Sequence, residues 1–315
     1  MKFLIYPPIN ESDLAQLQNI ARDVTFINAP DEATAYAHIE DADAMYGRLT
    51  PGLMAQARKL RWVQTSGAGL ERYIFPELAN SDIILTNMAG IYGDQIADHV
   101  IAFVLMFARG MHLYVRHQLA HQWQTGLPFL HVADQTLGVV GLGGIGNEVA
   151  RRGHALGMRV LAVDAKPRSK PDYVAELWGS DQLDHLLAEA DFVVLCVPHT
   201  PETAKLITLP RLQRMKPTAY LINVSRGIVV DLADLTTALQ TGIIAGAGLD
   251  VFEIEPLPVD HPLWEMENVI ITPHMASGVN SPHIPSRRMS LLHENLRRFL
   301  AGEPLQNVID KLRWF

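Results

Sequence analysis

Short apolar runs alternate with amphipathic segments through the first 93 residues of the chain. The apolar runs are typical of buried strands, and the segments between them are typical of helices. The expected strands span residues 2–6, 24–28, 42–46, 61–64 and 83–86, and the expected helices span residues 14–21, capped by Ser12 or Asp13, and 51–58. This alternation predicts an α/β fold with a parallel sheet.

Residues 94–121 follow the period of an α-helix. Apolar side chains recur at spacings of three and four, at Ile96, Val100, Val104, Phe107, Met111 and Val115. This spacing predicts one long helix, which could bridge two domains.

Strands and helices alternate again through residues 136–280. The six expected strands span residues 136–140, 159–163, 192–197, 219–223, 245–249 and 269–272, which predicts a doubly wound parallel sheet. The C-terminal stretch, residues 285–300, is a charged amphipathic helix without a strand of its own, so we expect it to return to the first domain.

A glycine motif stands at the end of the first of these strands. Gly141, Gly143 and Gly146 form a G-x-G-x-x-G sequence, and the next strand ends at Asp164, 18 residues after the last glycine. Such glycines let the backbone turn tightly and approach a pyrophosphate, while the acid accepts hydrogen bonds from ribose hydroxyls. The unit predicts a dinucleotide site rather than an ordinary tight turn.

Composition narrows the class of protein. The 315 residues, 48% of them hydrophobic, are enough for two domains, and a net charge of −8 provides no basic field for nucleic acid or anionic membranes. Neither the apolar start of the chain nor the apolar run at 100–108 is long enough to cross a membrane. The single cysteine, Cys196, permits no internal disulfide and is expected in the core. We therefore expect a cytoplasmic protein.

Three later strands are each followed by residues that suit carbonyl chemistry. Arg226 can hold a carboxylate in a bidentate fork, and His274 is a natural proton donor near neutral pH. An acid from the loop that contains Asp250, Glu253 and Glu255 could hold the histidine ring and favour its charged form. Each residue alone could be structural, but together they predict a carbonyl reduction site.

Four motifs, GLGGIG at 141–146, NVSRG at 223–227, LDVFEIEPLP at 249–258 and NVIITPH at 268–274, resemble the D-isomer-specific 2-hydroxyacid dehydrogenases. The resemblance extends to residues 60–69, 86–87 and 302–308, and so covers nearly the whole chain. It implies a Rossmann-type cofactor domain, residues 101–284, inserted in a flavodoxin-like substrate domain made of residues 1–100 and 285–315. A length of 315 residues is similar to that of the compact glyoxylate and hydroxypyruvate reductases.

The resemblance also implies residue roles. Arg226 would bind the carboxylate of a small 2-oxo acid, His274 would exchange the proton, and Glu255 would pair with His274. Gly67, Ala68 and Gly69 would hold the same carboxylate from the other domain, and Asp250 would contact the nicotinamide. The expected cofactor-binding residues are Gly141, Gly143, Gly144, Ile145, Gly146, Asp164, Val197, Pro198, Thr203, Val224, Ser225, Asp250 and His274. No metal ligand is assigned.

Several alternatives stay open. Asp164 favours NAD over NADP because a carboxylate repels a 2′-phosphate, whereas the nearby Lys166, Arg168 and Lys170 could offset that repulsion. The same scaffold also resembles NAD-sensing corepressors and phosphite and formate dehydrogenases. Glu255 weakens the formate interpretation. A homodimer is implied by the resemblance, formed through the apolar helix at 96–115.

Overall fold

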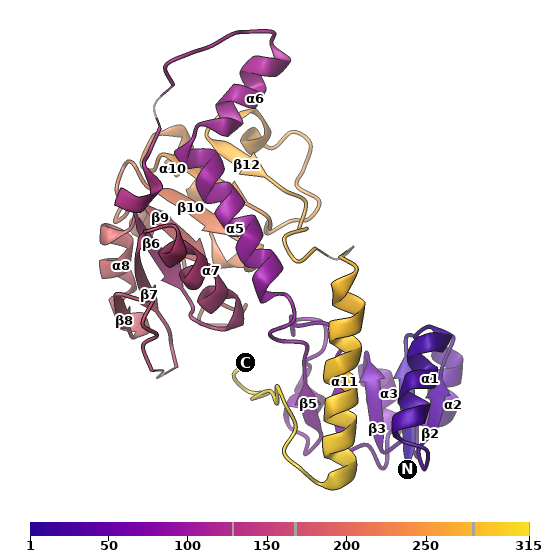
Figure 1. Cartoon of the computed structure of the whole chain (residues 1–315). Helices are drawn as coiled ribbons and strands as arrows, with labels where there is room; N and C mark the ends of the chain where they lie inside the picture. Colours follow the sequence, from indigo (N-terminus) through magenta and orange to yellow (C-terminus); the bar gives the residue numbers. More distant parts are fainter. Residues whose placement is uncertain (128, 167–168, 279–280, 315) are drawn as a thin grey trace. The chain divides into compact units, whose positions relative to one another are not determined.

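The computed structural model describes residues 1–127, 129–166, 169–278 and 281–314. The chain divides into two compact units (Figure 1). Unit 1 combines both ends of the chain, Met1–Ile91 and Asn280–Phe315, and unit 2 is the continuous segment Tyr92–Val279. The division after Ile91 precedes the predicted boundary at residue 100. The reason is that Gly93 already packs in unit 2, where an added Cβ would lie 3.0 Å from the carbonyl oxygen of Gly144.

Unit 1 is built on a five-stranded parallel sheet in the order β2-β1-β3-β4-β5, the flavodoxin-like order. Its strands are β1 (Lys2–Tyr6), β2 (Thr25–Asn28), β3 (Ala44–Gly47), β4 (Trp62–Gln64) and β5 (Ile84–Thr86). Its helices are α1 (Glu11–Ile20), α2 (Glu32–Ile39), α3 (Pro51–Gln56), α4 (Pro76–Ala79) and α11 (His283–Ala301). The five predicted strands are confirmed, whereas α2 and α4 were not predicted.

The start of α1 corrects one prediction. Asn10, rather than Ser12 or Asp13, caps the helix, because its backbone is extended and its Oδ1 accepts from the Asp13 amide at 2.8 Å.

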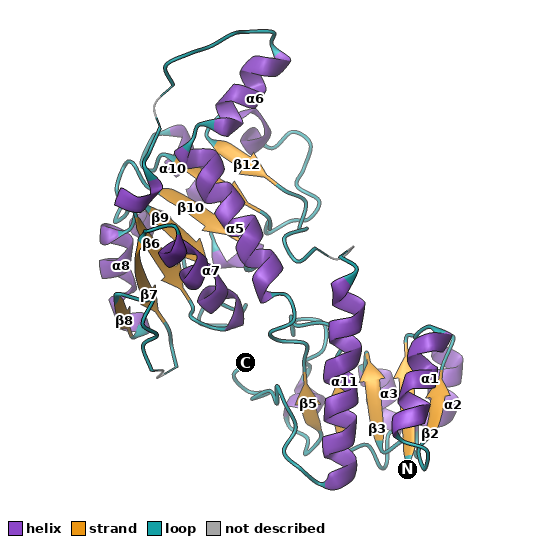
Figure 2. Cartoon of the chain, viewed as in Figure 1, coloured by secondary structure: helices purple, strands orange, loops and turns teal. Residues whose placement is uncertain are grey.

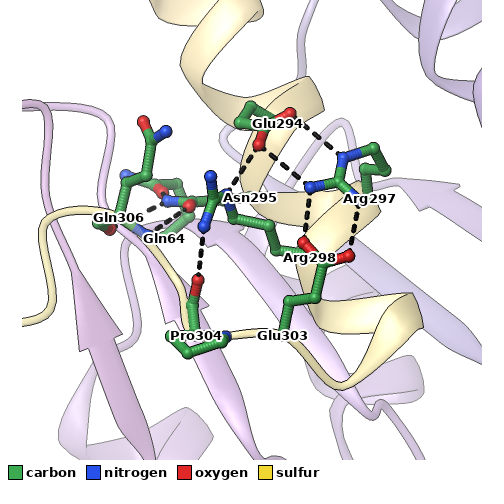
Figure 3. A network of polar contacts seen from close by, with 8 residues as sticks. All are labelled: Gln64, Glu294, Asn295, Arg297, Arg298, Glu303, Pro304 and Gln306. Carbon is green, nitrogen blue, oxygen red and sulfur yellow. Dashed lines mark hydrogen bonds and ion pairs between the residues drawn. The ribbon is translucent and has the colours of Figure 1, made fainter.

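The predicted return of the C-terminal helix to the first domain is confirmed, and a buried polar network holds it there (Figure 3). Asn295 of α11 is fully buried, and its Nδ2 donates to Gln64 Oε1 at 2.8 Å. The same oxygen accepts from the Thr86 hydroxyl at 2.8 Å, and Asn295 Oδ1 accepts from the Gln306 amide at 2.7 Å. The network therefore joins α11 to strands β4 and β5 and to the C-terminal tail.

Unit 2 is built on a seven-stranded parallel sheet in the order β12-β11-β10-β9-β6-β7-β8. Its strands are β6 (Thr136–Val140), β7 (Arg159–Val163), β8 (Glu176–Trp178), β9 (Phe192–Leu195), β10 (Tyr220–Asn223), β11 (Gly246–Leu249) and β12 (Val269–Ile271). The six predicted strands are confirmed, and β8 is added at one edge. Strands β6 to β11 follow the doubly wound order, in which the direction of strand addition reverses between β6 and β9.

The helices of unit 2 cover both faces of this sheet, except α6, none of whose residues is fully buried (Figure 2). They are α5 (Gly93–Ala108), α6 (Met111–Leu119), α7 (Gly144–Ala155), α8 (Leu183–Glu189), α9 (Leu209–Leu212) and α10 (Leu232–Gln240), with 3-10 turns η1 (Val132–Asp134), η2 (Ser180–Gln182), η3 (Gly227–Val229) and η4 (Pro262–Glu265). One apolar core packs α5 and α7 against one face, and a second packs α8 and α10 against the other. Successive side chains of β9 alternate between the two cores, as the strand period requires.

The prediction of one continuous helix over 94–121 is wrong. The helix breaks after Ala108, and Gly110 adopts a left-handed conformation with φ of 62°. The apolar periodicity continues across the break, and it therefore does not reveal the change in backbone direction at this one glycine. None of the described helices alone is long and apolar enough to cross a membrane; α5 and α6 reach that length and composition only together, across a bend of 71°.

Candidate active site

The glycine motif forms the turn between β6 and α7. Gly141 has φ of 92°, which favours glycine, and an added Cβ on Gly146 would lie 2.0 Å from the Gly141 carbonyl oxygen. Gly143, by contrast, has nothing within 4 Å of its Cβ position. Two glycines therefore close the turn, and the third leaves open space beside the N-terminus of α7. This arrangement fits a pyrophosphate, which would meet backbone amides and the positive end of the helix dipole.

Asp164, at the end of β7, lies against this turn. Its Oδ2 accepts from the Leu142 amide at 2.7 Å, and its Oδ1 accepts from the Lys166 amide at 2.8 Å. These bonds fix the carboxylate beside the glycine loop, where a ribose would lie. Of the basic residues expected to offset its charge, Lys170 donates to the Val174 carbonyl at 2.8 Å, and Arg168 lies outside the described residues.

The loop after β9 lies next to the glycine turn, at the point where the strand order reverses. An added Cβ on Gly141 would lie 2.9 Å from Val197 Cγ1. The Thr203 hydroxyl donates to the Pro198 carbonyl at 2.7 Å and accepts from the Thr200 amide at 2.7 Å, so it closes this loop on itself. Burial raises the pKa of Cys196, just before the loop, to about 12, which agrees with its interpretation as a packing residue.

Arg226 stands in the loop after β10, which is organised by a buried amide. Asn223 is 1% exposed; its Oδ1 accepts from the Ser225 amide and hydroxyl at 3.1 and 2.8 Å, and its Nδ2 donates to the Arg226 carbonyl at 3.0 Å. Val224 and Ser225 are also buried. The Arg226 guanidinium, which is half-buried, donates to the Ser225 carbonyl at 2.7 Å.

Gly227 lets this loop pack on the next one. An added Cβ would lie 1.8 Å from the carbonyl carbon of Phe252. The close approach that this glycine permits is therefore to the loop after β11, which carries Asp250, Glu253 and Glu255. Because β10, β11 and β12 are neighbours in the sheet, the three predicted loops lie side by side.

His274 and Glu255 are in direct contact, as expected. His274 Nδ1 lies 2.7 Å from Glu255 Oε2, and Glu255 Oε1 accepts from the Phe252 amide at 3.0 Å. The carboxylate thus holds the ring by Nδ1 and leaves Nε2 for a substrate. The His274 backbone has φ of 52°, a left-handed conformation that costs free energy in a residue other than glycine.

Asp250 holds the backbone around this histidine. Its side chain is 2% exposed; Oδ1 accepts from the Thr272 hydroxyl at 2.6 Å and the Met275 amide at 2.8 Å, and Oδ2 accepts from the Ala276 amide at 2.9 Å. Its own carbonyl accepts from the His274 amide at 2.8 Å. The contact with nicotinamide stays a prediction, whereas the support of the His274 loop was not predicted.

The predicted carboxylate-binding residues of unit 1 follow β4. The Gly67 carbonyl accepts from the Thr65 hydroxyl at 2.7 Å, and the Ala68 carbonyl accepts from Asn87 Nδ2 at 2.8 Å. These bonds fix the loop within unit 1, and the role of the amides of Gly67, Ala68 and Gly69 stays a prediction. Within the described ranges, no three His, Cys, Asp or Glu side chains are grouped so as to hold a metal ion.

Comparison with known proteins identifies the scaffold. Residues 101–276 match the family model of the D-isomer specific 2-hydroxyacid dehydrogenase, NAD binding domain. A glyoxylate reductase from Korarchaeum cryptofilum is 39% identical over 293 residues, which cover 90% of this chain and 87% of the relative.

Solved structures agree over the whole chain. A D-isomer specific 2-hydroxyacid dehydrogenase from Xanthobacter autotrophicus Py2, in complex with NADPH and MES, has a TM-score of 0.85 and 32% identity, covering 100% of this chain and 99% of that one. The NADPH-dependent glyoxylate/hydroxypyruvate reductase from Sinorhizobium meliloti, in complex with NADP and sulfate, has a TM-score of 0.84 and 26% identity, with coverage of 100% and 99%. The predicted fold class and NAD(P) cofactor are thereby confirmed, and the chain belongs to the D-isomer-specific 2-hydroxyacid dehydrogenase family as an NAD(P)-dependent enzyme.

Proposed function

We propose that this enzyme reduces small 2-oxo acids, of the glyoxylate and hydroxypyruvate type, to D-2-hydroxy acids with His274 as the proton donor. The observation that carries the proposal is the 2.7 Å contact between His274 Nδ1 and Glu255, which leaves Nε2 to face a substrate. The similarity to reductases named for glyoxylate and hydroxypyruvate supports the substrate class.

In the proposed reaction, Arg226 binds the carboxylate of the oxo acid through its guanidinium and orients the adjacent carbonyl. The reduced nicotinamide cofactor, held at the glycine turn, would supply the hydride that the carbonyl carbon accepts. His274 Nε2 donates its proton to the carbonyl oxygen, which becomes the hydroxyl of the product, and Glu255 stabilises the ring through Nδ1 in both protonation states. Water then returns a proton to His274.

The test is the loss of absorbance at 340 nm with glyoxylate, hydroxypyruvate, pyruvate, phenylpyruvate and 2-oxoisocaproate. We expect turnover of the small acids, and we expect His274→Ala to lower kcat by about 10²–10⁴-fold, the usual range for a general acid. His131→Ala is the matched control, because this histidine is exposed and pairs with Asp134. A His274→Ala enzyme with near-normal kcat would contradict the proposed role.

We also propose that NADH is preferred over NADPH. Asp164 is the basis, since its carboxylate is fixed beside the glycine turn and would repel a 2′-phosphate. The ratio of kcat/KM for the two cofactors measures the preference, and Asp164→Ser should shift it toward NADPH. A wild-type enzyme that prefers NADPH, as its relative from Sinorhizobium meliloti does by name, would contradict this proposal.

Finally, we propose a homodimer formed through α6 and the segment that follows it. No residue of α6, which is described throughout, is fully buried. Large apolar side chains are exposed there: Met111 by 49%, Val115 by 46%, Leu119 by 77% and Trp123 by 96%. Light scattering should give twice the chain mass for the wild type and less for a Leu119→Ser/Trp123→Ser variant. Val259→Ser is the control, since Val259 is equally exposed elsewhere in unit 2; a monomeric wild type would refute the dimer.

A further inference from the structure

A polar chain that is part-buried runs from α5 to the loop of His274, and nothing in the proposed reaction uses its first two members. His99 Nε2 lies 3.0 Å from the Thr272 hydroxyl oxygen. The same hydroxyl donates to Asp250 Oδ1 at 2.6 Å. The His99 side chain is 18% exposed, and its ring lies edge-on to Phe103 with the centroids 4.7 Å apart.

The single proton of the Thr272 hydroxyl fixes which group donates and which accepts in each of these hydrogen bonds. A threonine hydroxyl has one proton, and that proton is given to the Asp250 carboxylate. The hydroxyl oxygen must therefore accept from His99, so the His99 ring carries its proton on Nε2. Each member then donates to the next, from His99 to Thr272 to Asp250.

The chain ends on the backbone that shapes the catalytic loop. Asp250 binds the amides of Met275 and Ala276 with its carboxylate and the amide of His274 with its carbonyl. Those bonds surround the residue whose φ is 52°. A backbone in this conformation persists only where neighbouring contacts hold it, and the Asp250 contacts are placed to do so.

We propose that His99 and Thr272 are positioning residues, which orient the Asp250 carboxylate and through it hold His274 in the backbone conformation that presents its ring. This inference rests on the proposed role of His274. Without the Thr272 hydroxyl, one lone pair of Asp250 Oδ1 loses its donor, and the carboxylate can rotate away from the two amides. A displacement of about 1 Å at the proton donor is enough to lower turnover about 100-fold.

Matched variants separate positioning from packing. Thr272→Val keeps the shape and removes the hydroxyl, whereas Thr272→Ser keeps the hydroxyl. Likewise His99→Leu removes the donor, whereas His99→Gln keeps an N–H at the distance of Nε2. We expect Thr272→Val and His99→Leu to lower kcat by about 10- to 100-fold with KM for the cofactor changed less than about threefold. Thr272→Ser and His99→Gln should retain most of kcat.

Two further measurements test the mechanism of the effect. The double variant Thr272→Val/His99→Leu should lose no more kcat than the worse single variant, because both residues act through one carboxylate. Val104→Ala, at a fully buried position on the same helix, should lower the Tm but leave kcat unchanged, since it removes packing and not the chain.

Each result separates this inference from the proposed function. A kcat within twofold of wild type in both Thr272→Val and His99→Leu, with His274→Ala inactive, would overturn the positioning role and leave the function standing. A loss of kcat in Val104→Ala that parallels its Tm would also overturn it, because packing alone would then explain the effect. An active His274→Ala enzyme would overturn the proposed function itself.

Discussion

The two units use buried polar residues at the ends of their sheets in different ways. In unit 1 the central residue is Asn295, which is neutral and joins parts of the chain that lie 231 residues apart in sequence. In unit 2 it is Asp250, a carboxylate whose hydrogen-bond donors lie 22 to 26 residues away. The first brings distant segments together, and the second shapes a single loop.

This difference distinguishes a residue that stabilises the fold from a residue that shapes the candidate site. A neutral amide whose groups are paired holds elements together without placing a charge in the interior. A buried carboxylate is costly unless every oxygen is paired, and the donors to the Asp250 carboxylate are the Thr272 hydroxyl before His274 and the Met275 and Ala276 amides after it. The carboxylate therefore marks the unit that carries the loop of His274.

The largest effect should follow from Asp250→Ala. This change leaves the Thr272 hydroxyl and two backbone amides without their acceptor, and each unpaired buried donor costs about 1–3 kcal/mol. We expect the free energy of unfolding to fall by about 3–5 kcal/mol and kcat by more than about 100-fold. Urea titration and 340 nm assays measure the two quantities. Asp260→Ala, at an exposed position, is the control, and an Asp250→Ala enzyme with at least a third of wild-type kcat would remove the contrast between the units.

Asn295→Ala should give a smaller loss, and one of stability rather than turnover. It breaks the link from α11 to Gln64 and to Gln306, for which we expect about 2–3 kcal/mol and less than about a fivefold change in kcat at a permissive temperature. Glu294→Gln, on the same helix, is the control. Glu294 is only partly buried, its pKa is lowered to about 2 by Arg297 and Arg298, and we expect the Tm of the variant to lie within about 2 °C of wild type. Equal losses from the two changes would contradict the role of the buried amide.

The smallest expected effect is a loss of thermal stability at low pH. Burial lowers the pKa of His99 and of His112 in unit 2, and of His293 in unit 1. Because the unfolded histidine pKa is then higher than the folded one, the unfolded chain binds more protons as pH falls, and stability is lost below about pH 6.5. We expect calorimetry to show a Tm lower by about 2–6 °C at pH 5.5 than at pH 7.5. His99→Gln should lose less than wild type over this interval; an identical pH dependence would exclude a contribution from His99.

Most of the fold could be predicted because apolar runs and glycine turns are local signals. β8, Glu176-Leu-Trp178, was missed because it lacks an apolar run. The break at Gly110 was missed because the apolar period continues across it. In both cases the deciding factor is backbone pairing or conformation, which hydrophobic patterning does not encode.

The residues of the candidate site could also be predicted only in part from the sequence. Arg226, Asp250 and His274 could be found because parallel strands end at one edge of the sheet. His99 could not, since 173 residues separate it from Thr272 and nothing around it forms a motif. The positions that support the loop of His274 depend on tertiary packing, and so they appear only in the folded structure.

The division of unit 1 between both ends of the chain sets the order in which the protein can fold during synthesis. Unit 2 is continuous, so all of its strands leave the ribosome before α11 does. Trp62 is fully buried in the folded protein and packs against Phe299 of α11, with the ring centroids 5.1 Å apart. Its ring therefore lacks this cover until α11 has been synthesised. The nascent chain therefore carries an uncovered sheet face until α11 has been synthesised, and a chaperone or an aggregating neighbour would bind that face.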